Sequence, residues 1–291
     1  MEERAQLALE NILRHLSQGE IPAAADTLED LHPADGADVL MELGTRQQEQ
    51  ILSVTSAQAV ARILEHLSDA DTVQVSHRIQ ANILPQVLDN MEADKAADLL
   101  NELPPDQASS ILSRMVGAAN VASLLLHPED SAGGIMSLQF VVFEEDITTQ
   151  QAIDYLRRVR PSSERVYYLF VRDPGNHLTG VLSLRQLVIA SPGEKVRDIM
   201  NTEVISVPAG TDREACARLM EHYNLSALPV VDEERRLVGV ITLEEVVDVI
   251  EEEATEDMYR MVGLPDEERV GSPFLFSVKK RLPWLYINLG T

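Results

Sequence analysis

The sequence is poor in cysteine, in aromatic residues and in long apolar runs. One cysteine, Cys216, stands among 291 residues, so no disulfide can form within the chain and a reducing cytoplasm is the natural compartment. Aromatic residues make up only 4%, so any core must be built mainly from Leu, Val, Ile and Ala. No apolar run approaches the roughly eighteen residues of a membrane span. The opening MEERAQLALENIL carries acidic residues where a signal peptide has positive charge.

Positive charge is scarce as well. The chain has 24 Lys and Arg against 48 Asp and Glu, a net charge of −24, which argues against nucleic acid and against broad adhesion to anionic lipid. Residues 1–128 and residues 129–257 each carry a net charge of −13, whereas residues 258–291 carry +2. Two acidic blocks in contact should repel each other unless something positive lies between them.

Catalytic and transition-metal motifs are missing from the sequence. The seven histidines include no pair spaced four residues apart, and thiolate ligands are lacking, which disfavours a zinc-type site. No Ser/His/Asp grouping stands out, and the GxxxxGK[ST] phosphate loop is absent. We therefore expect a protein that is not an enzyme.

What the first part contains is helix. Within residues 1–128 one motif recurs, at residues 37–43, 61–67 and 97–103, with starts 24 and 36 residues apart. Short amphipathic helices repeated at such spacing predict an α-helical superhelix, which offers a surface rather than a pocket. Asp94, Asp98 and Glu102 are four residues apart and share one helix face. That face is either solvated or part of a cation site.

After residue 128 a β/α unit occurs twice. Residues 135–136 (Ile-Met) return at 199–200, and residues 180–184 (GVLSL) return as 239–243 (GVITL). In each copy an acidic turn, at 173–176 and at 232–235, separates two β-branched runs, as a hairpin requires. We place the first unit at residues 129–197 and the second at 198–249. Cys216 lies on the apolar side of a helix in the second unit and is expected in its core.

The run from residue 243 to residue 257 is the most acidic in the chain, with eight of its fifteen residues acidic and none basic. Val246, Val247, Ile250 and Ala254 recur at helical spacing, so residues 243–270 are predicted to form an amphipathic helix whose apolar stripe packs on a neighbour. The acidic face opposite the stripe is either solvated or neutralised by a cation.

The end of the sequence, residues 271–291, combines basic and aromatic residues. Three basic residues at 279–281 directly precede Trp284, Leu285, Tyr286 and Ile287. This order is typical of a cytoplasmic approach to a membrane helix. We expect a membrane domain to follow, although an ordinary amphipathic tail would show the same order.

These motifs resemble two known families. The paired units resemble tandem CBS domains, through residues 198–200 (DIM), 228–232 (LPVVD) and 237–242 (LVGVIT). The whole arrangement resembles the cytosolic part of the MgtE family of magnesium channels, through residues 132–136 (AGGIM), 181–185 (VLSLR), 253–257 (EATED) and the KKRLPWL segment. The resemblance implies a helical N domain, a CBS pair and a long acidic connecting helix, in a homodimer that joins its own transmembrane pore on the cytoplasmic face of the cell membrane.

The resemblance also implies a function and a set of ligands. In the family the cytosolic part senses Mg²⁺, with ions between the helical domain, the CBS domains and the connecting helix. Our hypothesis is that the ion neutralises this interface, closes the assembly and holds the connecting helix against the pore. The matching positions in this sequence are Asp94, Asp98, Gly134, Asp212, Glu214, Glu221, Asn224, Glu245, Asp248, Glu253, Glu256 and Asp257. The sequence departs from the family at Arg62, where a carboxylate is usual, and at Asn224, where an acid is usual. Either one bridging site is lost, or Arg62 forms a fixed salt bridge to the CBS side.

Two other functions remain open at this point. CBS pairs often bind adenine nucleotides, and Tyr168, Arg185 and Leu225 could line a pocket for ATP or AMP. The Asp that usually follows Ser/Thr-x-x to hold the ribose is replaced by Gln186 after Ser183 and by Glu245 after Thr242. The third alternative is a helical adaptor whose acidity serves solubility.

Overall fold

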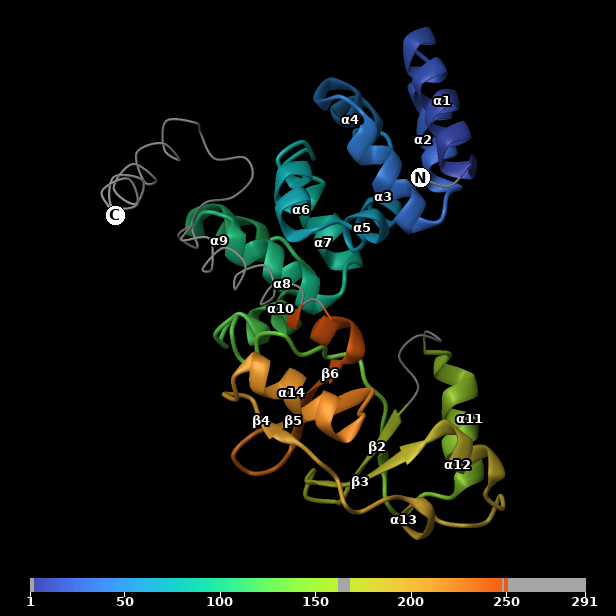
Figure 1. Ribbon diagram of the computed structural model, residues 1–291, viewed down its shortest axis with the longest axis vertical. Coiled ribbons are helices and arrows are strands. Elements are labelled where there is room, and N and C mark those ends of the chain that lie inside the picture. The colour runs from blue at the N-terminus through green and yellow to red at the C-terminus, as the bar shows by residue number, and fades with distance from the viewer. Residues whose placement is uncertain (1–2, 162–167, 248, 251–291) are drawn as a thin grey trace, which may run out of the picture.

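The structure, a computed structural model, describes residues 3–161, 168–247 and 249–250 (Figure 1). The predicted residues 251–270 of the connecting helix, and the basic and aromatic segment at 271–291, lie outside this range. Within the described residues no helix is both long and apolar enough to cross a membrane.

The first part of the chain is a stack of short helices, which confirms the predicted superhelix. Each helix packs on near neighbours in sequence: α1 on α2 and α3, α3 on α5, α5 on α7, and α8 on α7 and α10. The three repeated motifs fall on α3, α5 and α8. The helices are α1 (Glu3–Gln18), α2 (Ile21–Glu29), α3 (Pro33–Glu42), α4 (Thr45–Leu52), α5 (Ala57–Leu64), α6 (Asp69–Ser76), α7 (Leu84–Asn90), α8 (Ala93–Glu102), α9 (Pro105–Leu112) and α10 (Ala118–Leu124).

Local sequence explains where these helices begin and end. Gly19, just after α1, has a φ of 78°, a left-handed conformation that glycine adopts without a steric penalty. Proline in the first turn starts α2, α3, α7 and α9, where its missing N–H costs nothing. Ser56 and Ser68 accept a backbone N–H from the first turn of α5 and α6. The helices are short because the turns between them are well specified.

Part of the acidity of this region holds the stack together. Three carboxylates each accept a backbone N–H from a residue 27 positions later, at distances of 2.7 to 2.9 Å. Each accepted N–H lies at or next to the beginning of a later helix, where backbone donors lack a partner within the helix. The pairs are Glu29 with Ser56, Glu65 with Glu92, and Asp89 with Val116.

The second part contains two small units of like topology. In each, the first strand pairs in parallel with the second, and the second pairs antiparallel with the third. The first unit comprises β1 (Val142–Glu144), α11 (Thr149–Val159), β2 (Tyr168–Arg172), β3 (Leu178–Ser183), α12 (Leu184–Ile189) and α13 (Val196–Ile199). The second comprises β4 (Val207–Pro208), α14 (Arg213–Tyr223), β5 (Ala227–Val231) and β6 (Leu237–Thr242). The predicted duplication and the fold class are confirmed.

The segment before the first strand of each unit pairs with the third strand of the other unit. Ser137, which precedes the first strand of the first unit, exchanges backbone hydrogen bonds of 2.9 and 3.0 Å with Val240 in β6 of the second. Asn201 exchanges the equivalent bonds, of 2.8 and 2.9 Å, with Val181 in β3. A Cβ at Gly239 would overlap the Met136 side chain, and a Cβ at Gly180 would overlap Met200. The residues matched between the repeats in the sequence are therefore the ones that meet where the units cross.

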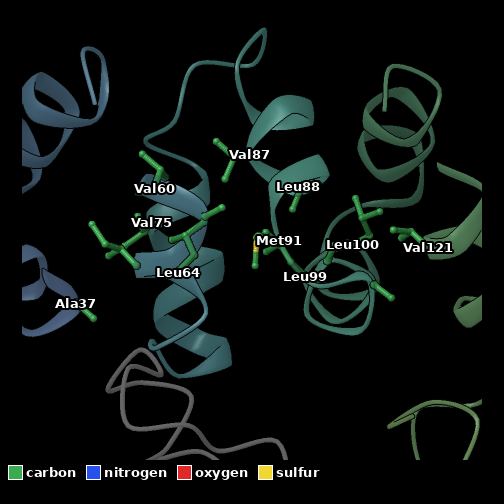
Figure 2. Close-up of a cluster of buried hydrophobic side chains, with 14 of the residues drawn as sticks. Ala37, Val60, Leu64, Val75, Val87, Leu88, Met91, Leu99, Leu100 and Val121 are labelled. Carbon is green, nitrogen blue, oxygen red and sulfur yellow. The ribbon is translucent and has the colours of Figure 1, made fainter. Parts of the chain in front are cut away.

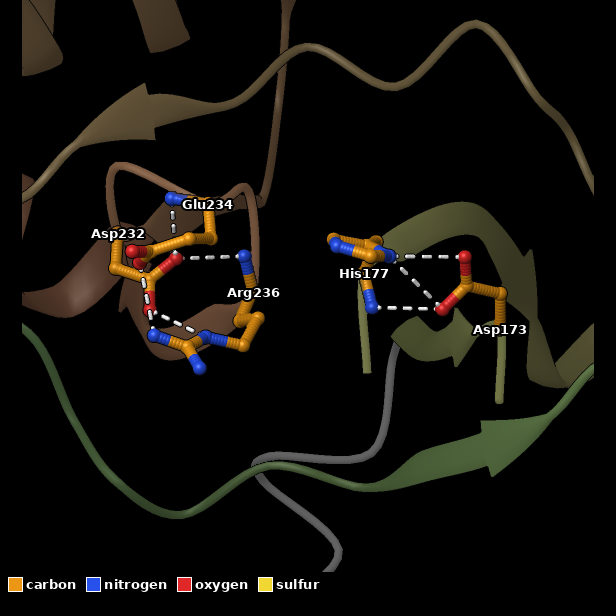
Figure 3. Close-up of polar contacts among 5 residues, drawn as sticks. All are labelled: Asp173, His177, Asp232, Glu234 and Arg236. Atoms are coloured by element: carbon orange, nitrogen blue, oxygen red, sulfur yellow. Dashed lines mark hydrogen bonds and ion pairs between the residues drawn. The ribbon is translucent and has the colours of Figure 1, made fainter. Parts of the chain in front are cut away.

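The turns of the two hairpins are held by similar carboxylates (Figure 3). Asp173 accepts the backbone N–H of His177 at 2.9 Å and contacts its ring Nδ1 at 3.0 Å. Asp232 accepts the backbone N–H of Arg236 at 2.8 Å and its side-chain Nε at 2.7 Å. The hairpins also meet, because His177 and Arg236 form a β-bridge.

The boundaries of the hydrophobic cores do not coincide with the boundaries of the helical stack and the two units. One cluster of buried side chains runs through the helical stack (Figure 2) and continues into the second unit, through residues such as Met220, Ile241 and Val246. The first unit has a separate core around Leu169 and Leu182. The end of the stack that carries α8 and α10 therefore rests on the second unit, as Figure 1 shows.

The helix that follows β6 departs from the predicted pattern. Residues 243–247 and 249–250 are helical, as expected. Val246 and Val249 are buried at 3% exposure, but Val247 and Ile250 are 46% and 51% exposed, so the predicted stripe is wrong at these two positions. Valine or isoleucine stands at 246, 247, 249 and 250, so periodicity alone does not determine which side faces the helical stack.

A candidate cation site between the helical stack and the second unit

Five acidic residues gather where the helical stack meets the second unit, and we call them the acidic seam: Asp69, Asp94, Asp98, Glu129 and Glu245. They come from α6, from α8, from the link between the two parts of the chain, and from the helix after β6. The negative charge of Glu245 raises the pKa of Asp94, and the charges of Asp69, Asp94 and Glu129 raise the pKa of Asp98. The fold thus brings together carboxylates that are far apart in the sequence.

Asp94 is the most unusual member of the seam. It lies in the first turn of α8, where a negative charge suits the helix dipole, yet it is only 3% exposed. Burial raises its pKa to about 6, and the nearby charge of Glu245 adds to the rise. Its own amide and that of Lys95 oppose this shift, but neither carboxylate oxygen forms a hydrogen bond with a residue that the structure describes. A buried carboxylate without a partner is unfavourable and needs a proton or a cation.

Glu245 faces Asp94 from the second unit. It lies in the first turn of the helix after β6 and is only 9% exposed. Its Oε2 accepts hydrogen bonds from the backbone N–H of Thr242, at 3.2 Å, and from the Thr242 hydroxyl. One carboxylate oxygen thus caps the helix, while the charge of the group acts on Asp94.

Asp98 lies one turn after Asp94 on α8 and is half-buried. Burial raises its pKa to about 7, with further contributions from Asp69, Asp94 and Glu129, while the Lys95 ammonium partly offsets the rise. Asp98 and Lys95 also line a small pocket against α5 and α6, together with Glu65, Asp69 and Glu102 above Leu64 and Leu99. The predicted face of Asp94, Asp98 and Glu102 is therefore a graded one, from buried to exposed, and not a uniformly solvated surface.

Residues 130–134 connect the seam to the start of α14. Ala132 donates its N–H to the carbonyl of Thr211 at 2.6 Å, and Gly133 donates to Ala209 at 2.8 Å. Gly134 is held so close to the preceding turn that a Cβ would overlap the carbonyl oxygen of Pro128. This packing places Glu129 beside Asp98 and Gly134 near the second unit.

The four candidates on α14 divide between its two ends. Asp212 accepts the N–H of Ala215 at 2.9 Å as the N-cap, and Glu214 pairs with Arg218 at 2.9 Å. Glu221 and Asn224 are exposed at the other end. Because α14 has 11 residues, its ends lie about 15 Å apart, so these four residues do not share one ion.

Local structure explains the departure at Asn224. Its φ of 52° is left-handed, and its N–H closes the end of α14 on the carbonyls of Met220 and Glu221. Asparagine adopts this conformation more readily than most residues. Arg62, the other departure, is exposed in the last turn of α5 and forms no ion pair with the residues that the structure describes.

A complete metal cage is not present in the described part of the chain. There, no three His, Cys, Asp or Glu side chains come together closely enough to hold a metal ion by themselves. Four of the predicted ligands, Asp248, Glu253, Glu256 and Asp257, lie outside the residues whose side chains are described. The seam can still suit Mg²⁺, a hard cation that keeps several waters and uses one or two carboxylates.

The candidate nucleotide residues are only partly brought together. Tyr168, at the start of β2, pairs with Ser183 in β3, two residues before Arg185 in α12. Leu225 lies in the second unit between α14 and β5. The side chains at the two ribose-holding positions are already engaged, because Gln186 accepts from Ser183 at 2.7 Å and Glu245 accepts from Thr242.

Sequence reasoning missed three residues of this site. Glu129 belongs to no periodic pattern and is brought to Asp98 only by the turn before Gly134. Asp69 lies in the first turn of α6, where it looks like an ordinary favourable helix charge. Lys95, beside Asp94, carries a positive charge that lowers the pKa of both Asp94 and Asp98. Its place among the acids was readable from the sequence.

The fold and the seam define a CBS-pair protein whose second unit is joined to an α-helical superhelix. Family models agree: the MgtE intracellular N domain matches residues 31–130, and the CBS domain matches residues 196–252. The magnesium transporter MgtE of Thermus thermophilus is 36% identical over 100% of this chain, and that of Bacillus subtilis is 30% identical over 94%. A crystal structure of the cytosolic domain of the Mg²⁺ channel MgtE in complex with ATP is 34% identical, with a TM-score of 0.77 over 83% of this chain and 99% of that one.

The chain therefore belongs to the MgtE family. It spans 66% of the length of the Thermus relative and 61% of the Bacillus relative.

Proposed function

We propose that this chain is the cytosolic Mg²⁺-sensing region of a magnesium transporter or channel. Mg²⁺ bound in the acidic seam joins the helical stack to the second CBS unit, and the joined form favours the closed pore. The observation that carries this proposal is Asp94, a carboxylate at 3% exposure with no hydrogen-bond partner among residues 3–161, 168–247 and 249–250, opposite Glu245 of the other part of the chain.

The energetics of the seam are large enough for a switch. Two carboxylates 4 Å apart repel by about 1 kcal/mol in water and about 4 kcal/mol at an effective dielectric constant of 20. Moving an equilibrium from 1:99 to 99:1 takes about 5.5 kcal/mol. Asp94, Asp98 and Glu245 lie at the junction with their charges coupled, so a divalent cation that neutralises them would favour closure by a comparable amount.

The ligands differ in how directly the structure supports them. Asp94, Asp98 and Glu245 are the residues that would hold the ion in the seam, with Glu129 in reach of Asp98. Gly134, Asp212 and Glu214 would serve a second position near the start of α14, and Glu221 and Asn224 a third at its end. Asp248, Glu253, Glu256 and Asp257 remain predictions from the resemblance.

The assembly is proposed to be a homodimer on the cytoplasmic face of the cell membrane, joined to its own transmembrane pore. The helix that follows the third strand of each CBS unit exposes apolar side chains: Leu184, Val188 and Ile189 in the first, and Leu243, Val247 and Ile250 in the second. Such a repeated apolar surface suits the same surface of a second copy. On this proposal the chain regulates transport and is not an enzyme.

Small-angle scattering with and without Mg²⁺ tests the proposal. We expect the radius of gyration to fall when Mg²⁺ replaces chelator, because closing the seam compacts the molecule. Asp94→Asn removes the buried charge and should remove most of the Mg²⁺ response. The matched control is Asp146→Asn, an acidic residue of the first unit that pairs with Lys195 at 2.8 Å, and it should respond like the parent chain. An unchanged radius in the parent chain contradicts the proposal.

Adenine-nucleotide sensing is the second candidate, favoured by the relative whose cytosolic domain was solved with ATP. Tyr168 and Arg185 lie near one end of the β2–β3 hairpin, where an adenine and a phosphate could bind. The capping roles of Gln186 and Glu245 weigh against a ribose contact. Adding ATP to the same scattering titration separates the two: compaction by ATP without Mg²⁺ would favour nucleotide sensing, and a response to neither would favour an adaptor.

A further inference from the structure

We infer that Thr242 is a positioning residue for the acidic seam. This inference rests on the Mg²⁺-sensing function proposed above. Thr242 ends β6 and directly precedes the helix at 243–250. Its backbone N–H and its hydroxyl both donate to Oε2 of Glu245. The threonine thus fixes the orientation of the one seam carboxylate that belongs to the second unit.

The two oxygens of Glu245 consequently have different roles. Oε2 caps the helix, and on this inference Oε1 is the atom that a cation between Glu245 and Asp94 would use. At 9% exposure the side chain has little room to adopt another rotamer. A cation held at Oε1 therefore does not compete with the cap, and closing the seam and ordering the start of this helix reinforce each other.

The first unit contains the same arrangement without the charge. Ser183 ends β3, and Gln186 accepts from its N–H at 2.9 Å and from its hydroxyl at 2.7 Å. Gln186 also donates to the carbonyl of Ile199 at 3.2 Å. The capping arrangement is therefore common to both units, and the second unit differs by placing a carboxylate there, against the helical stack. Ser183 provides a matched control for Thr242.

The first experiment is a Mg²⁺ titration of compaction in the full chain. Thr242→Val keeps the shape but removes the hydroxyl, and we expect its Mg²⁺ midpoint to rise about tenfold, which corresponds to about 1.5 kcal/mol, the lower end for one hydrogen bond to a charged group. Thr242→Ser keeps the hydroxyl and should stay within about twofold of the parent chain. Ser183→Ala should leave the midpoint unchanged. Thr242→Ala gives the same comparison should the valine variant fold poorly.

A double-mutant cycle separates positioning from a merely structural role. In the Glu245→Gln background, Thr242→Val should produce no further change in the Mg²⁺ midpoint, because the group that it orients has lost its charge. If Thr242 serves only stability, Thr242→Val should lower the unfolding temperature in chelator equally in both backgrounds and leave the Mg²⁺ midpoint unchanged. A parental midpoint in Thr242→Val overturns the inference, whereas a parent chain that ignores Mg²⁺ overturns the proposed function instead.

Discussion

The two CBS units share a scaffold but differ in what surrounds them. Both have the same strand order, the same glycine against a methionine of the other unit, and the same cap after the third strand. The first unit has its own core, whereas the second shares one with the helical stack. Among the described residues, the acidic seam forms beside the second unit and not beside the first. The charges proposed to bind Mg²⁺ therefore belong to the contact between the helical stack and the second unit and not to the CBS fold itself.

A second comparison, within the helical stack, separates structural acids from the acids of the seam. Glu29, Glu65 and Asp89 each satisfy a backbone N–H near a helix start. Asp94 is more deeply buried than these and accepts no hydrogen bond within the described part of the chain. An acid that accepts N–H groups stabilises the fold when charged, whereas an acid buried without partners destabilises it until something neutralises it.

The largest effect is expected from Asp94→Asn, measured as stability against pH in chelator. Below the usual pKa of 3.8, Asp94 is protonated in both the folded and the unfolded chain. Between that value and its folded value of about 6, the folded chain holds a proton that the unfolded chain has released, so stability falls as pH rises. The asparagine of the variant does not titrate, so the variant should gain on the parent chain across this window, by about 2–3 kcal/mol above pH 6.

A control of opposite sign sharpens this result. The pKa of Asp146 is lowered by its hydrogen bond to Lys195 and by the charge of Arg197. Asp146→Asn should therefore lose stability relative to the parent chain once the pH exceeds about 4. Thermal unfolding between pH 4 and pH 8 measures both variants. If the Asp94→Asn advantage were the same at every pH, Asp94 would not be a destabilising buried charge.

The next largest effect is expected from alanine substitutions at the two glycines where the units cross, measured as loss of stability. Gly239→Ala would push a Cβ into Met136, which is buried at 3% exposure, and we expect a loss of about 1–3 kcal/mol, typical of overpacking. Gly180→Ala meets Met200, which is half-buried and has more room to move. Thermal unfolding should show the larger drop for Gly239→Ala. Equal drops would mean that sharing a core with the helical stack does not tighten the second unit.

Much of the fold was predictable because short sequence patterns determine it locally. Repeated helical motifs, the Ile-Met and Gly-Val matches and the acidic hairpin turns all specify structure over short stretches. The burial of Asp94 was not predictable, because it depends on Glu245 and Val246 reaching α8 from far along the chain. The choice of Val249 over Val247 and Ile250 for the buried side depends on the same contact.

Part of the candidate site has a sequence signal that we interpreted as evidence about nucleotide binding and not about the cation site. Thr242 and Glu245 form the Ser/Thr-x-x-Glu pattern that marks a helix cap, although the sequence drew attention to them for the missing ribose aspartate. Asn224 stands where a helix ends in a left-handed residue, which asparagine favours. Glu129 had no such signal, since only the three-dimensional turn at Gly134 places it beside Asp98.

The smallest effect separates the two hairpins. The Asp232–Arg236 pair is charged at any ordinary pH, whereas the Asp173–His177 pair carries two full charges only when the histidine is protonated. Each aspartate has its pKa lowered: in Asp173 by hydrogen bonds from His177, and in Asp232, where burial opposes the shift, by hydrogen bonds from Arg236 and by its charge. Because both pairs are exposed, Asp173→Asn and Asp232→Asn should each reduce the unfolding temperature only slightly. The loss should be larger in Asp232→Asn, because its carboxylate also accepts from a guanidinium that is always charged, whereas Asp173 contacts a histidine ring. Equal losses in thermal unfolding would mean that the backbone N–H contacts of the carboxylates, which the two hairpins share, account for the whole effect.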